Sequence, residues 1–205
     1  MANIGNVDYM SIPAKTDQMR GVGRELNEKM QSMYDKIKEL HEFWYGERYN
    51  RLVEGFNKIR PSVNNIVELI FTQLPASLDT IANNYSKLDR SMNIRTVSDE
   101  KPRIIEELPK MDDTGKFRFI SNSVAEVKQE VEAKISKGIE LIDEFENIYR
   151  TIDWESDAAT SYKSVFARLK EEVVTSLNNL KKDFTELMLQ AEQDAKLTED
   201  TNTVE

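Results

Sequence analysis

Apolar residues recur at steps of three and four over four long segments, and this spacing constrains the fold more than any other feature of the chain. Steps of this kind place their members on one face of an α-helix. The first segment contains Met19, Val22, Leu26, Met30, Met33, Ile37, Leu40 and Trp44. It predicts a helix that begins near Ser11 to Pro13, because proline is tolerated in the first helical turn.

The second segment predicts a helix from about Glu47 to Arg90, roughly 65 Å long at about 1.5 Å per residue. Its apolar series is Leu52, Phe56, Ile59, Val63, Ile66, Ile70, Leu74, Leu78, Ile81, Tyr85 and Leu88. Pro61 and Pro75 lie inside it, and each removes a backbone hydrogen bond. We expect kinks or short breaks there rather than a chain reversal, because the apolar series continues past both prolines.

Residues 91–118 lose the helical period and contain Pro102, Pro109 and Gly115, which indicates a linker with at most one short helical turn. A third helix is expected to follow. Ser123 and Glu126 have the spacing of a capping box, in which each side chain accepts an otherwise unpaired backbone N–H. The apolar series of this helix is Val124, Val127, Val131, Ile135, Ile142, Phe145, Tyr149 and Ile152.

The fourth apolar series is Ala158, Tyr162, Val165, Leu169, Val173, Leu180, Phe184, Leu187 and Ala191. Phe166, Leu177 and Met188 widen this stripe, so the fourth helix is expected to touch more than one neighbour. The residues after Lys196 are polar and read as a tail.

The two halves of the chain are a repeat. A shift of 110 positions places Trp44 on Trp154, and it places apolar residues on apolar residues over more than thirty positions after the tryptophans. Upstream of the tryptophans the phase disagrees, so the two bends should differ. Duplication predicts a first hairpin at 1–90, a linker at 91–118 and a second hairpin with a polar tail at 119–205.

The predicted fold class is all-α, with two antiparallel helical hairpins in tandem that pack as a four-helix bundle. In this pseudo-dimer the linker must run back along the bundle, over about 50–65 Å given the helical rise. Its extended reach of about 90 Å suffices, at roughly 3.3 Å per residue. The competing arrangement is a dimer in which each hairpin pairs with another chain.

A tryptophan is expected at each bend. The first bend reads Phe43-Trp44-Tyr45-Gly46-Glu47, where Gly46 can take a left-handed conformation. The second reads Asp153-Trp154-Glu155-Ser156-Asp157-Ala158-Ala159. This pattern resembles the WXG (Trp-X-Gly) family of helical hairpins exported by bacterial type VII secretion systems. Trp44 and Gly46 match the full motif, whereas Ser156 replaces the glycine after Trp154.

A second motif adds to the resemblance. Tyr85 and Asp89 fit the family's Tyr-X-X-X-Asp/Glu export signal at the end of the second helix, and the second repeat has Ala195 at the position of the tyrosine. The resemblance implies a virulence-associated protein made in the cytoplasm and exported to the medium or cell surface without a cleavable signal peptide. It also implies a motor ATPase as partner, and possible binding to a helical partner or toxin.

Residues suited to catalysis are scarce. The chain has no cysteine and a single histidine, His41, and it contains no glycine-rich phosphate loop. We therefore expect no enzymatic activity, no metal site and no cofactor. The net charge of −9 argues against nucleic-acid binding, and no apolar run approaches the roughly 18 residues of a membrane span. Stable membrane insertion is therefore not expected.

Three alternatives to an exported interaction protein remain open. The chain could be an accessory or targeting partner of a larger type VII toxin. It could be a helical structural adaptor unrelated to secretion. A pore-forming protein is disfavoured because the sequence lacks a long apolar hairpin.

Overall fold

The computed structural model describes residues 7–154 and 157–202, and it is all-α apart from two short strands. Five α-helices form most of the molecule: α1 (Ile12–Glu39), α2 (Glu47–Glu68), α3 (Leu74–Arg90), α4 (Ser121–Arg150) and α5 (Asp157–Asn202). The 3-10 helix η1 (Leu40–Glu42) follows α1, and the π-helix η2 (Leu69–Gln73) joins α2 to α3. The strands are β1 (Trp44–Tyr45) and β2 (Arg118–Phe119).

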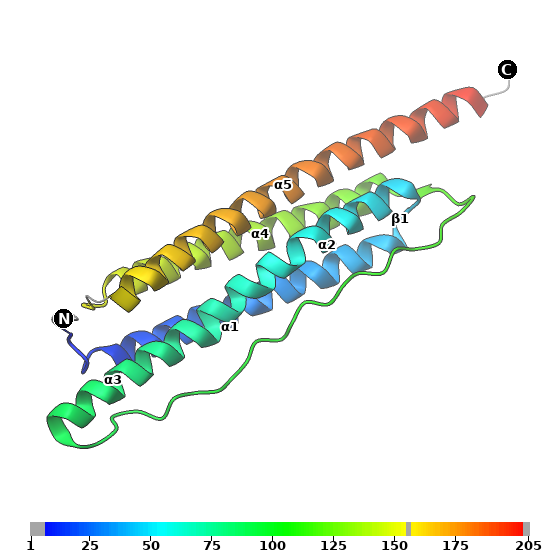
Figure 1. Cartoon of the computed structure of the whole chain (residues 1–205). Helices are drawn as coiled ribbons and strands as arrows, with labels where there is room; N and C mark the ends of the chain where they lie inside the picture. The colour runs from blue at the N-terminus through cyan, green and yellow to red at the C-terminus, as the bar shows by residue number, and fades with distance from the viewer. Residues whose placement is uncertain (1–6, 155–156, 203–205) are drawn as a thin grey trace.

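The helices form two hairpins that lie antiparallel to each other (Figure 1). Helix α1 packs mainly along α4, and α2 packs along α5, so the main helix contacts join one hairpin to the other. The bend between α1 and α2 lies at the opposite end of the bundle from the bend between α4 and α5. The predicted all-α bundle of two antiparallel hairpins is confirmed.

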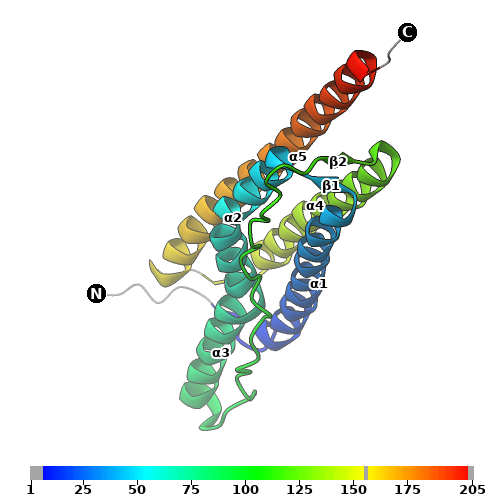
Figure 2. The same ribbon diagram turned by 90° about the vertical axis from the view of Figure 1, so that its right-hand side faces the viewer.

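The core follows the apolar series closely. Every predicted core position of the first and third helices is buried. The second series is less completely buried, since Ile81 and Tyr85 are half-buried and Leu88 is 84% exposed. Leu88 is therefore wrongly assigned to the core, because the end of α3 extends past the neighbouring helices (Figure 2).

The predicted break in the second helix occurs at only one of the two prolines. Helix α2 continues through Pro61, whereas η2 ends at Gln73, two residues before Pro75. In η2 the backbone N–H of Leu74 reaches the carbonyl of Leu69, five residues back. Pro75 has no backbone N–H to donate within the helix. The wider hydrogen-bonded turn just before it accommodates this loss, and the helix continues as α3.

Helix α1 approaches this π-turn closely. A Cβ atom added at Gly23 would lie 2.7 Å from the Cα atom of Phe71. Glycine at position 23 therefore allows α1 to pack on the backbone of η2.

The predicted capping box at Ser123 is wrong. Helix α4 begins two residues earlier, at Ser121, and no side chain caps it. The backbone N–H of Ile120 donates to the carbonyl of Phe43 at 3.0 Å, directly after the pairing of Phe119 with Trp44. Pairing with the first bend sets the start of α4, so Ser123 lies inside the first turn.

The second bend repeats this arrangement. Val7 forms an antiparallel bridge with Trp154, just as Phe119 pairs with Trp44. Each tryptophan therefore pairs with the segment that precedes the first helix of the other hairpin.

Residues 91–117, called the strap below, connect the hairpins without any helical turn. The strap runs the length of α3 and α2, on the side away from α5, and returns the chain to the first bend (Figures 1 and 2). The predicted linker path along the bundle is observed, and the helical turn that we allowed in it is not.

Candidate functional site

The predicted signal residues lie at the end of α3, on the surface. Helix α3 ends at Arg90, and Ser91 follows in the left-handed conformation with φ of 56°. The Asp89 side chain is 58% exposed, and Tyr85 is half-buried one helical turn before it. Both side chains project from the same side of the helix.

Tyr9, which sequence analysis did not single out, contacts both signal residues. Its hydroxyl donates a hydrogen bond to Asp89 Oδ2. Its ring stacks on Tyr85, with centroids 6.5 Å apart and planes 10° apart. The hydrogen bond from Tyr9 lowers the pKa of the Asp89 carboxyl and raises the pKa of Tyr9. Tyr9 therefore orders this end of α3.

The first bend holds Trp44 and Gly46. Trp44 is fully buried, edge-on to Phe119 at 5.6 Å and stacked on Phe184 at 6.2 Å between ring centroids. Gly46 has φ of 119° and ψ of −174°, a conformation open essentially to glycine alone. The predicted positive φ is confirmed, although the conformation is not that of a left-handed helix.

A carboxylate from the strap fastens this bend. Asp113 Oδ2 accepts a hydrogen bond from the Gly46 backbone N–H at 3.1 Å, and Asp113 Oδ1 lies 3.2 Å from His41 Nε2. Burial, with a smaller effect from the charge of Asp113, raises the pKa of Tyr49 to about 12. Asp113 of the strap therefore contacts both His41 and the backbone of Gly46 at this bend.

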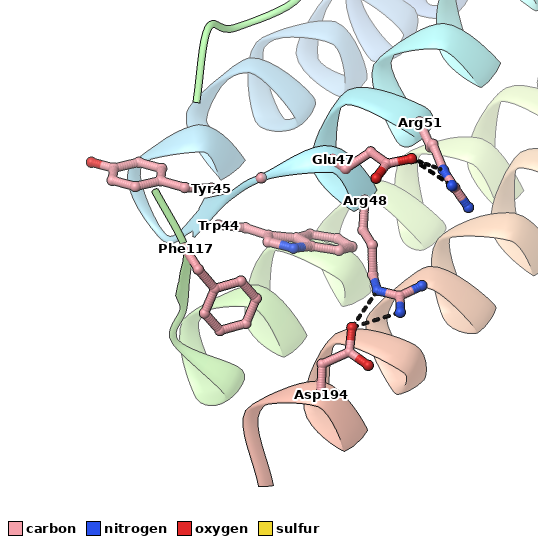
Figure 3. Close-up of a pocket in the computed structure, with 8 residues that line it drawn as sticks. Trp44, Tyr45, Glu47, Arg48, Arg51, Phe117 and Asp194 are labelled. Carbon is pink, nitrogen blue, oxygen red and sulfur yellow. Dashed lines mark hydrogen bonds and ion pairs between the residues drawn. The ribbon is translucent and has the colours of Figure 1, made fainter. Parts of the chain in front are cut away.

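A pocket opens beside Trp44, between α2 and α5 (Figure 3). The two arginines that line it are already paired. Arg48 donates to Asp194 Oδ2 from Nε at 2.8 Å and from Nη2 at 2.6 Å, and Arg51 donates to Glu47. The Arg48–Asp194 pair holds the first turn of α2 against α5, and the Arg51–Glu47 pair lies within α2. Together the two carboxylates neutralise the positive charge at the pocket.

The second bend holds Trp154, which is 5% exposed. Its ring lies 6.1 Å from the ring of Tyr162, whose hydroxyl is 2.8 Å from Ser77 Oγ on α3. Through Ser77 and the Val7 bridge, this bend lies at the same end of the bundle as Tyr85. Ser156, which replaces the motif glycine at this bend, lies outside the described residues. The structure therefore separates Trp44 and Gly46 from Tyr85 and Asp89, which share an end with Trp154.

A ladder of asparagine side chains binds the strap. Each carboxamide donates from Nδ2 to the carbonyl of one strap residue and accepts the backbone N–H of the same residue at Oδ1. The pairs in α2, with donor and acceptor distances, are Asn50 with Met111 (2.9 and 2.9 Å), Asn57 with Leu108 (2.8 and 2.9 Å), and Asn64 with Ile105 (3.0 and 3.0 Å). We call these three asparagines the ladder, and the three strap residues the anchors.

Side-chain amides on other helices extend this binding. On α1, Asn27 makes the same two-point contact with Arg103, and Gln31 also donates to the Arg103 carbonyl. On α3, Asn83 accepts from two strap N–H groups and donates to the Arg95 carbonyl. The strap is therefore held by its backbone over most of its length.

The ladder was not predicted, although the sequence contains two signals for it. The ladder asparagines are seven positions apart, which keeps them on one side of α2, and the anchors are three positions apart in the strap. The two spacings had to be read together, across a stretch that has no helical period of its own.

A buried ion cluster, also not predicted, lies between α1 and α3. Asp79 is fully buried and accepts from Thr16 Oγ1 at 2.6 Å and from Arg20 Nη2 at 2.5 Å. Arg95 of the strap places its Nε 3.0 Å from the same carboxylate and also pairs with Asp17. This cluster fastens the start of the strap to the bundle.

Within residues 7–154 and 157–202, no three His, Cys, Asp or Glu side chains are grouped so that they could hold a metal ion. Among the helices of the same residues, none combines the length and the apolar content that crossing a lipid bilayer requires. Comparisons with protein-family models, with curated proteins and with solved structures found no match.

Proposed function

We propose that this protein is a non-enzymatic helical interaction protein exported by a bacterial type VII secretion system, a tandem form of the WXG hairpin. The observation that carries the proposal is the position of Tyr85 and Asp89. They lie one turn apart at the exposed end of α3, so one partner can contact both side chains.

The opposed hairpins support a single chain that acts as its own dimer. Helix α1 covers α4 and α2 covers α5, so the surfaces that two separate hairpins would use on each other are already buried. We therefore expect a monomer, which light scattering at the mass of one chain would support and a stable mass of two chains would oppose.

A second candidate is an accessory protein that binds a larger toxin substrate. Exposed apolar side chains next to the signal residues favour a partner at this end of the bundle, since Leu88 is 84% and Met92 is 56% exposed. Co-purification of the chain with a toxin from its host would favour the accessory role over that of an independent substrate.

The test is secretion from a host with an active type VII system. Tyr85→Ala and Asp89→Ala should each abolish export while circular dichroism remains unchanged. Tyr45→Ala is the matched control, because Tyr45 is also half-buried but lies at the opposite end of the bundle. Normal export of both signal variants would show that the motif is a coincidence, and a native chain that is not exported would make the export proposal wrong.

A further inference from the structure

The ladder recognises the strap by its backbone. Each of its carboxamides bonds both the N–H and the carbonyl of one residue, groups that every residue except proline presents in the same way. These hydrogen bonds would form with any extended segment in the same register.

The spacing of the ladder fits a regular extended chain. Seven residues of α2 rise about 10.5 Å, and three residues of extended or polyproline-type chain rise about 9–10 Å. The ladder residue numbers increase as the anchor numbers decrease, so the strap runs antiparallel to α2. The match between the two rises lets the ladder continue over three pairs, two steps of seven residues in α2 and of three in the strap.

Side-chain recognition is limited to every third position. The anchors Ile105 and Leu108 are 1% and 2% exposed and join the core, and Met111 packs against it. Between them the strap faces solvent: Ile104 is 67% exposed, and the side chain of Glu107 is 70% exposed. The groove therefore selects an apolar residue at every third position and tolerates variation at the other two.

This binding exceeds what a connector needs. A flexible loop of this length costs little more to close than a shorter one, so the two hairpins could be joined without a docked strap. The ladder is also absent from the second hairpin, where the positions 110 residues later are Thr160, Ala167 and Val174. The groove is thus a feature of the first hairpin alone and not a general requirement of the fold.

We propose that the groove bearing the ladder is a binding site for an extended segment of a partner protein with an apolar residue at every third position. In the structure the strap occupies this groove, and the partner segment binds by displacing the strap. Because the strap is tethered at both ends, its effective concentration is on the order of millimolar or higher, so displacement requires a segment with better anchors. This inference is independent of export.

The test uses a fluorescein-labelled peptide that copies residues 100–113, and a full-length chain weakened at the anchors by Ile105→Ala and Leu108→Ala. Fluorescence anisotropy should show saturable 1:1 binding to the weakened chain, and binding to the native chain weaker by roughly tenfold or more. A peptide whose apolar residues are moved to adjacent positions should not bind. If the double variant is not helical by circular dichroism, the single variant Leu108→Ala takes its place.

The decisive control is a substitution in the groove itself. Asn57→Leu in the weakened chain should reduce peptide affinity by roughly tenfold, because two hydrogen bonds are lost. Asn84→Leu, at an exposed position of α3, should not change it. A folded weakened chain that binds no peptide, or binds it equally well with Asn57→Leu, would overturn the proposal. A weakened chain that instead forms a stable pair of chains and excludes the peptide would overturn it as well, since the groove would then select the strap of a second copy.

Discussion

Trp44 and Phe119 pair across a two-stranded sheet, with their rings edge-on and 5.6 Å apart between centroids. One residue closes the first bend and the other begins the second hairpin. The strand that pairs with the first bend is therefore supplied by the other half of the chain.

Removing Trp44 should destabilise the whole molecule. Trp44 is fully buried against Phe119 and Phe184, so Trp44→Ala should lower the free energy of unfolding by about 3–5 kcal/mol. Urea denaturation followed by circular dichroism measures this loss. Phe117→Ala is the matched control, because Phe117 is 56% exposed and should change stability by less than about 0.5 kcal/mol. An unchanged midpoint for Trp44→Ala would mean that the ring does not pack as described.

Glycine substitutions in the helices should have opposite signs. Gly23→Ala places a methyl group 2.7 Å from the Phe71 Cα atom, so it should cost about 1–3 kcal/mol as α1 moves away from η2. Gly21→Ala and Gly55→Ala meet no atom within 4 Å and should stabilise the protein by about 0.5–1 kcal/mol each. Thermal denaturation of the three variants compares them directly. A neutral Gly23→Ala would contradict the close packing of α1 on the π-turn.

The two carboxylates that share Arg95 should differ in importance. Asp79→Ala leaves Arg20 buried without its counter-ion and should cost about 3–5 kcal/mol. Asp17→Ala removes a side chain that is 64% exposed, so it should cost less than about 1 kcal/mol. Chemical denaturation at neutral pH measures both. Equal losses would show that the buried cluster contributes no more than a surface pair.

Acid should weaken the contact between Tyr9 and Asp89. The pKa of Asp89 is lowered in the folded state, chiefly by the hydrogen bond from Tyr9. A lowered carboxyl pKa contributes stability above the unfolded pKa, and this contribution is lost as pH falls through the folded pKa. Carboxyl-carbon NMR titration should give a lower pKa for Asp89 in the native chain than in Tyr9→Phe. The same pKa in both chains would mean that Tyr9 does not bind the carboxylate in solution.

Apolar periodicity predicted the helices well, because a long helix that is buried on one face has apolar residues at steps of three and four along its sequence. The series from Met19 to Trp44 is buried throughout. The same reasoning failed at Leu88, because spacing along one helix cannot tell where the neighbouring helices end. It also failed at Ser123, where strand pairing with a residue far away in the sequence set the start of α4.

The candidate site was predicted only in part. Tyr85 and Asp89 could be named from their spacing, since both lie in one helix turn. Tyr9 could not, because its contacts arise where the N-terminal segment meets the far end of α3. Contacts between segments so distant in sequence depend on how the hairpins are opposed, and no local pattern reports this.

The reciprocal pairing of the bends has a consequence for synthesis on the ribosome. When residues 1–90 have emerged, Trp44 has no partner strand, because Phe119 is made later. Val7 is made first, but its bridge cannot form until the second hairpin has been synthesised as far as Trp154. Neither bend can close until the other half of the chain exists, so the nascent first hairpin leaves the ribosome with an open end. We expect it to remain sensitive to proteases and to chaperone capture until the second hairpin has been made.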